Sequence, residues 1–140
     1  MTAHPHPSVR CQVIKRDLRM SSEASLDHDH FVELEFQTPN TPPSTHRFSV
    51  DKDECPAPYA ILLALTDFFE EHEVNPPVIL YVSDLFAFNI LTDYLKRWKA
   101  SNWFSSNGKP VKYVDILSEF HDIMVSKKIG YKVLFVPDHT

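Results

Sequence analysis

The segment that most constrains the fold is a continuous apolar run, Val-Ile-Leu-Tyr-Val, at positions 78–82. Helical segments are predicted on either side of it, at 57–72 and at 84–99. A short apolar run between two helical segments is typical of a central strand covered on both faces. The run therefore predicts an α/β fold with strand 78–82 inside a sheet.

The rest of the chain predicts one domain with the element order βββαβααβ. A third amphipathic helix is predicted at 113–126, and a turn, TPNTPPST, at 38–45. The other strands are predicted at 9–14, 31–36, 45–50 and 132–136, with 31–50 forming a hairpin. Two prolines and two histidines near the start predict a flexible tail at 1–8, followed by a single domain at 9–140.

Composition excludes several classes of protein. Only two glycines are present, Gly108 and Gly130, so a glycine-rich phosphate-binding loop is excluded. No apolar run approaches the ~18 residues that a membrane span needs. Two cysteines, Cys11 and Cys55, do not make a disulfide framework, and we expect them to be small buried residues. These features predict a cytoplasmic protein without a membrane segment.

Charge is distributed unevenly along the chain, whose net charge is -5. Residues 1–92 carry six basic and fourteen acidic side chains, whereas 93–112 carry five basic and one acidic. A local basic segment matters more for contact with nucleic acid than the global charge does. Segment 93–112 is therefore the candidate binding surface.

Four segments in the second half of the chain share their order and spacing with one known family. They are LYVSD at 80–84, LKRWKASNW at 95–103, GKPVKYVDIL at 108–117 and FVPDH at 135–139. They resemble the Thr-Asp-Ser strand, the basic Trp-Lys…Trp segment, the Lys-Pro-Val-Lys…Asp-Leu segment and the Val-(Pro/Lys)-Gly-His segment of bacterial-type ribonuclease H. No gap is needed from Leu80 to about Lys128.

This resemblance implies both a fold and a chemistry. The fold is a ribonuclease H-like mixed sheet of about five strands with helices on its faces. The family cuts the RNA strand of an RNA–DNA hybrid with two Mg²⁺ ions held by four carboxylates. Because Mg²⁺ takes hard oxygen ligands, the matching carboxylates decide whether this chain shares the activity.

Most of those carboxylates are displaced or absent here. The first strand offers Asp17 near the matching position, without the glycine that follows it in the family. The second position falls in residues 55–58, which contain no acid, and Glu54 is the nearest one. Ser83 occupies the third position, and Asp84 follows it at a place suited to capping the next helix.

The end of the chain also departs from the family. Asp138-His139 stands where the family has Gly-His, and His139 matches its mobile histidine. The helix that carries the fourth carboxylate would lie beyond Thr140, so we expect it to be missing. Losing a metal ligand usually costs orders of magnitude in activity. We therefore expect a fold without two-metal catalysis and without a cofactor.

The substrate-binding side of the family is better represented. Its basic protrusion is matched by Lys96, Arg97, Trp98, Lys99, Trp103, Lys109 and Lys112. Cations of this kind pair with phosphates, and aromatic rings pack against sugars or bases. The alternative interpretation makes the tryptophans core anchors and the lysines a solvated face, and for Trp98 the structural role is favoured.

Two classes of function follow. In the first, the domain acts by binding an RNA–DNA hybrid, another nucleic acid or a protein partner, including a second copy of itself in a dimer. In the second, it is an active Mg²⁺-dependent ribonuclease H that uses Asp17, Glu54, Asp84 and His139, with Asp17 and Asp84 on the metal. Alternating Asp and His at 27–30 would bind a transition metal weakly, but a polar loop is the favoured interpretation.

Overall fold

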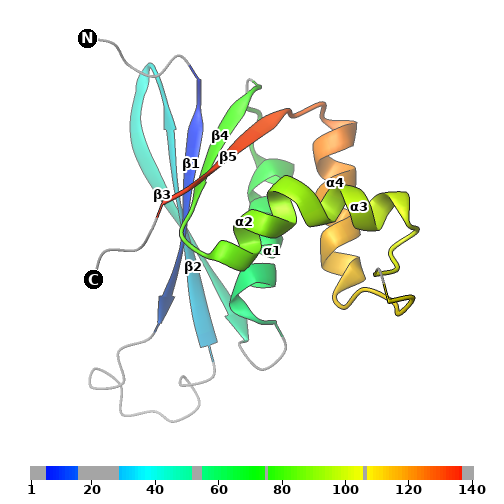
Figure 1. The fold of residues 1–140 in the computed structure, drawn as a ribbon. Coiled ribbons are helices and arrows are strands. Elements are labelled where there is room, and N and C mark those ends of the chain that lie inside the picture. The colour runs from blue at the N-terminus through cyan, green and yellow to red at the C-terminus, as the bar shows by residue number, and fades with distance from the viewer. Residues whose placement is uncertain (1–5, 16–28, 52–54, 75, 106, 137–140) are drawn as a thin grey trace, which may run out of the picture.

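The computed structural model of the chain describes residues 6–15, 29–51, 55–74, 76–105 and 107–136. The predicted element order is confirmed (Figure 1). The strands are β1 (Ser8–Lys15), β2 (Asp29–Thr38), β3 (Thr41–Asp51), β4 (Val78–Val82) and β5 (Tyr131–Phe135). The helices are α1 (Ala57–Glu71), α2 (Leu85–Asn89), the π-helix η3 (Ile90–Tyr94), α3 (Leu95–Ala100) and α4 (Val114–Ser126).

The five strands form one mixed sheet in the order β3-β2-β1-β4-β5. β1 pairs antiparallel with β2 and parallel with β4, and Cys11 lies opposite both Leu34 and Val82. β5 joins β4 in parallel, with Val133 opposite Leu80. The expected mixed sheet of about five strands, with helices packed on it, is therefore confirmed.

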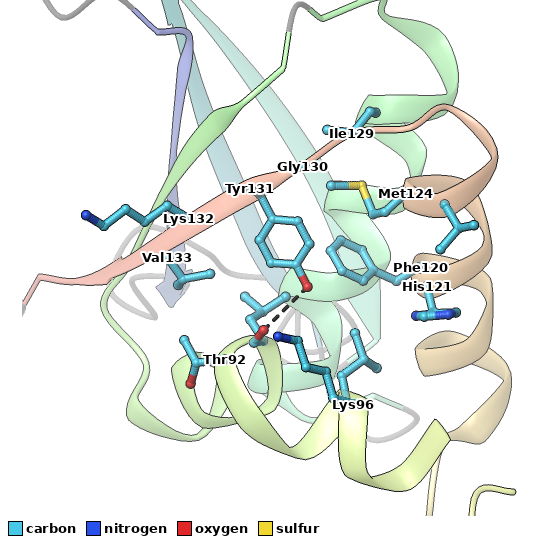
Figure 2. Close-up of a pocket in the computed structure, with 13 residues that line it drawn as sticks. Thr92, Lys96, Phe120, His121, Met124, Ile129, Gly130, Tyr131, Lys132 and Val133 are labelled. Carbon is cyan, nitrogen blue, oxygen red and sulfur yellow. Dashed lines mark hydrogen bonds between the residues drawn. The ribbon is translucent and has the colours of Figure 1, made fainter. Parts of the chain in front are cut away.

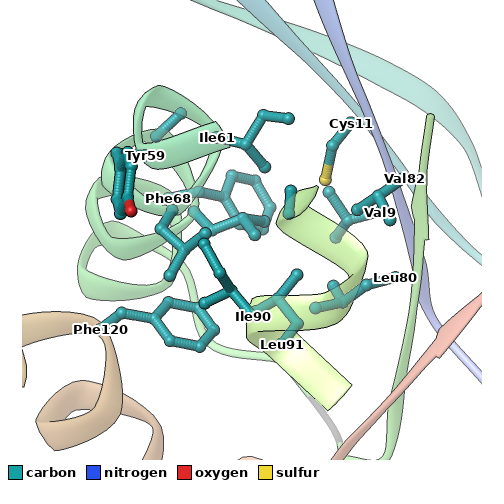
Figure 3. Close-up of a cluster of buried hydrophobic side chains, with 14 of the residues drawn as sticks. Val9, Cys11, Tyr59, Ile61, Phe68, Leu80, Val82, Ile90, Leu91 and Phe120 are labelled. Atoms are coloured by element: carbon teal, nitrogen blue, oxygen red, sulfur yellow. The ribbon is translucent and has the colours of Figure 1, made fainter. Parts of the chain in front are cut away.

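The core lies between the sheet and the helices. Val9 and Cys11 of β1 and Leu34 of β2 are buried. Arg10 and Gln12, which alternate with Val9 and Cys11 on β1, are exposed. Figure 3 shows the apolar side chains of β1 and β4 facing residues of α1, η3 and α4. In the described residues the helices thus cover one face of the sheet (Figure 1).

This one-sided covering corrects the prediction for β4. The apolar run predicts a strand buried on both faces, but only Val78, Leu80 and Val82 are fully buried. Ile79 and Tyr81 point to the other face and are half-buried. The Arg10 guanidinium lies 5.2 Å from the Tyr81 ring centre on that face. An apolar run can therefore mark a strand with one half-exposed face when neighbouring side chains cover part of it.

The hairpin between β2 and β3 is tighter than predicted. Its turn contains only Pro39 and Asn40, and Thr41 already pairs with Thr38. Pro42 and Pro43 thus lie in β3. The prediction that they belong to the turn is wrong. β3 is at the edge of the sheet, where a residue without an N–H group is tolerated.

The helical segment after β4 is continuous from Leu85 to Ala100 and includes a π-helical stretch. The Leu95 N–H donates to the Ile90 carbonyl, as in a π-helix. Within the described ranges, no helix is long and apolar enough to cross a membrane. Cys11 and Cys55 are free thiols and are buried, as expected.

Candidate nucleic-acid interface

The predicted basic segment occupies α3 and the loop that leads to α4. Lys96, Arg97 and Lys99 lie on α3, and Lys109 and Lys112 lie in the loop. All five side chains are exposed. The structure therefore exposes all five cations on α3 and the loop that follows it.

Backbone contacts give the loop a defined shape. Phe104 and Pro110 form an isolated antiparallel bridge, and the Val111 N–H donates to the Trp103 carbonyl at 3.0 Å. Gly108 turns the chain with a φ of 80°, a conformation that suits glycine. This hairpin-like turn holds Lys109 and Lys112 in place beside α3.

The cations differ in how much they are engaged. Arg97 pairs with Asp93, one helical turn away, at 2.5 Å and lies 5.3 Å from the Tyr94 ring centre. Lys96, Lys99, Lys109 and Lys112 make no ion pair with another described residue. These four lysines are accordingly the most available for phosphate groups.

Both tryptophans are half-buried and pack against the hydrophobic core. Trp98 lies 5.3 Å from Tyr94 between ring centres, and Trp103 lies 6.5 Å from His121. Trp103 also has a φ of 67°, which the surrounding backbone hydrogen bonds maintain. The structure therefore gives both residues the anchoring role, and each keeps part of its ring accessible.

A row of aromatic rings that the sequence analysis missed continues from Trp98. Neighbouring ring centres are separated by 5.3 Å from Trp98 to Tyr94, 6.0 Å from Tyr94 to Phe86 and 6.0 Å from Phe86 to Tyr59. Tyr113 closes the row at 4.4 Å from Tyr59. Phe86 is 40% exposed. Phe86, Tyr94 and Trp98 lie eight and four residues apart on one continuous helical segment, a spacing that places them on one face, whereas Tyr59 and Tyr113 join the row only after folding.

Asp84 caps a helix in this structure. Its Oδ1 accepts a hydrogen bond from the Ala87 N–H at 2.8 Å, so it caps α2. The capping interpretation is confirmed. The other catalytic candidates, Asp17, Glu54 and His139, lie outside the described residues, as do positions 27 and 28 of the Asp-His run.

No group of three or more His, Cys, Asp or Glu side chains able to hold a metal ion occurs among the described residues. The pairing of β1 with β4 ends at Cys11 opposite Val82, before Ser83 and Asp84.

No family model and no curated protein matches the chain. Solved structures do match. A foamy viral protease-reverse transcriptase in complex with an RNA/DNA hybrid has a TM-score of 0.60 and 14% identity. The match covers 92% of this chain but only 17% of the viral chain.

Two smaller structures match as well. The solution structure of the prototype foamy virus RNase H domain has a TM-score of 0.58 and 12% identity, covering 91% of this chain and 76% of the other. LC9-RNase H1, a type 1 RNase H with the type 2 active-site motif, has a TM-score of 0.53 and 10% identity. That match covers 96% of this chain and 65% of the other. The chain therefore has the ribonuclease H-like fold.

Proposed function

We propose that this ribonuclease H-like domain binds nucleic acid through segment 96–112 and does not cleave it. The observation that carries the proposal is the set of four exposed lysines without a described ion-pair partner, namely Lys96, Lys99, Lys109 and Lys112. Each cation that meets a phosphate releases condensed counterions, which favours binding. The lysines would position the nucleic acid without selecting its sequence.

The aromatic row gives this surface a second means of contact. Trp98, Tyr94 and Phe86 are each partly exposed and follow one another along the helical segment that also carries Lys96 and Lys99. Partly exposed rings of this kind pack against sugars and stack with bases. The solved foamy viral protein, which has the same fold, was captured with an RNA/DNA hybrid and with double-stranded DNA. An RNA–DNA hybrid is accordingly the first ligand to test.

Two observations favour binding over cleavage. The Asp84 carboxylate already accepts the hydrogen bond that caps α2. The described residues hold no group of three or more side chains able to ligate a metal ion. The competing function is an active Mg²⁺-dependent ribonuclease H, which would require Asp17, Glu54 and Asp84 to converge around the metal ions.

Binding is tested by fluorescence anisotropy with a labelled RNA–DNA hybrid over a range of salt concentrations. We expect the Lys96→Ala/Lys99→Ala variant to bind about tenfold more weakly and to show a salt slope smaller by about two. The control, Lys128→Ala/Lys132→Ala, removes two exposed lysines outside the segment. It should change the affinity by less than about twofold. Equal losses in the two variants would overturn the assignment of the interface.

Cleavage is tested on the same samples with Mg²⁺ and with Mn²⁺. We expect no metal-dependent product. Cleavage by the intact chain that disappears in Asp17→Asn or Asp84→Asn would overturn the proposal and establish the active ribonuclease H. The stability of each variant must be measured alongside, since Asp84 also caps a helix.

A protein partner is the second candidate because apolar side chains lie exposed on the edge strand β5. Leu134 is 37% exposed and Phe135 is 39% exposed. β5 pairs on one side only among the described residues, and an open edge of this kind favours association. If the intact chain binds no nucleic acid, sedimentation of the chain alone would show whether a second copy is that partner.

A further inference from the structure

A pocket of about 460 Å³ lies between η3, α3, α4 and the edge strand β5 (Figure 2). Its apolar lining includes Leu91, Leu95, Phe120, Met124 and Val133. Small-molecule sites are mostly apolar, concave and between about 300 and 1,000 Å³ in volume. The pocket therefore has the size and the lining of a small-molecule site.

The electrostatics of the pocket favour a negatively charged ligand. No residue that lines it carries a carboxylate, whereas Lys96 does line it. Lys96 makes no ion pair with another described residue. Figure 2 shows its side chain extending from α3 toward the hydroxyl end of Tyr131, while Lys132 extends to the other side of β5. Of the two lysines that line the pocket, Lys96 is thus the one whose side chain lies beside the apolar cavity.

Thr92, His121 and Tyr131 are the uncharged or weakly basic polar side chains of the lining. The Tyr131 hydroxyl donates to the Leu91 carbonyl at 3.4 Å, and burial raises the pKa of Tyr131 to about 12. The phenol stays neutral at physiological pH and does not repel an anion.

The walls of the pocket are suited to adaptation. Leu91 and Thr92 belong to the π-helical stretch, a distortion that is frequent at functional sites. Met124 supplies a flexible, polarisable side chain that fills irregular spaces. Neither feature specifies a ligand alone, but both are consistent with a binding pocket.

We propose that this pocket binds a small amphiphilic anion. Its apolar body lies against Met124, Val125 and Val133, and its carboxylate or sulfonate pairs with the Lys96 ammonium. The proposal does not depend on nucleic-acid binding, although Lys96 belongs to both surfaces.

The test compares two fluorescent dyes, 8-anilinonaphthalene-1-sulfonate and N-phenyl-1-naphthylamine, which has the same rings without the sulfonate. The folded chain should bind the sulfonate at one saturable site and the neutral dye about fivefold more weakly, as expected for one partly exposed charge pair. Lys96→Met should weaken the binding of the sulfonate dye by about fivefold and leave the affinity for the neutral dye unchanged.

The matched control is Lys99→Met, on the same helix but outside the pocket lining. It should leave the affinity for both dyes unchanged. Lys96→Met and Lys99→Met should weaken the binding of nucleic acid to the same extent. A second pair, Val125→Glu and Ser126→Glu, adds a charge at the pocket rim and next to it. Only Val125→Glu should weaken the binding of the sulfonate dye.

Several results would overturn the proposal. One is the absence of saturable dye binding to the folded chain. Others are equal effects of Lys96→Met and Lys99→Met on the sulfonate, or equal effects of Val125→Glu and Ser126→Glu. Circular dichroism of each variant separates loss of the pocket from loss of the fold.

Discussion

The Lys127 ammonium lies 2.5 Å from the Phe69 carbonyl oxygen and donates a hydrogen bond to it. It also donates to the Glu70 carbonyl at 3.2 Å. These carbonyls belong to the last turn of α1, where the helix dipole is negative. A residue just after α4 therefore satisfies the end of α1 and joins the two helices that pack together over the sheet.

Replacing Lys127 with methionine tests that contact. The variant keeps the apolar stem but leaves two helix-terminal carbonyls without a charged donor, so we expect a loss of about 1.5 kcal/mol in the free energy of unfolding. Urea denaturation measures the loss, with the exposed Lys132→Met as the control. A loss no larger than that of the control would show that water replaces the lysine without cost.

Lys128 offers a stabilising substitution. It adopts a φ of 57° directly after the α4 cap, and the Ile129 N–H donates to the Met124 carbonyl at 2.8 Å. This is a Schellman motif, in which the left-handed position is usually glycine. We expect Lys128→Gly to raise the free energy of unfolding by about 1 kcal/mol. Lys128→Ala should give no such gain, and a destabilised glycine variant would contradict this account.

Asp84 provides a test of the helix cap. Asp84→Ala removes the acceptor of the Ala87 N–H and should cost about 1 kcal/mol. Asp84→Asn keeps a capping oxygen and should remain close to the parent chain in stability. Thermal or urea unfolding compares the two variants. An equal loss in both would mean that the negative charge, rather than the cap, is what stabilises α2.

His46 gives the fold a dependence on pH. Its ring packs 5.1 Å from Phe68 and 5.0 Å from His72 between ring centres. Burial lowers the pKa of His46 below its ordinary value of 6.5, and His72 lowers it further against the opposing effect of Glu71. The unfolded chain then binds this proton more readily than the folded one.

Neutral His46 makes its full contribution to the free energy of unfolding above the pKa of about 6.5 that it has in the unfolded chain. This contribution falls as the pH drops from there toward the lower pKa of His46 in the folded chain. His46→Phe keeps an aromatic ring beside Phe68 and removes the titrating group. Its free energy of unfolding should decline less between about pH 7.5 and pH 5.5 than that of the parent chain. Identical pH profiles would show that other groups cause the decline.

Cys11 should be chemically inert in the folded chain. Its side chain is 1% exposed, and burial raises the pKa of its thiol to about 12. In a Cys55→Ser background, we expect iodoacetamide to label Cys11 at least about a hundredfold more slowly in native buffer than in denaturing urea. Rapid native labelling would show that β1 opens locally.

Local patterns predicted most of the elements. β4 has the predicted bounds, 78–82, because a short apolar run ended by prolines and a capping residue leaves little choice of element. α1 and α4 lie within one residue of their predicted ranges for a similar reason. Pro42 and Pro43 misled the prediction because turn propensity is local, whereas tolerance of proline in a strand depends on which strand is at the edge.

The candidate site divides in the same way. Amino-acid order alone determined that the cations of 96–112 are close in sequence, that Asp84 precedes a helix and that the elements follow the ribonuclease H-like order. Only the tertiary structure decided that Tyr59 and Tyr113 join the row of Phe86, Tyr94 and Trp98, and that Lys127 meets Phe69. Periodicity and capping act between residues a few positions apart, whereas these contacts require helices distant in sequence to pack on the same sheet.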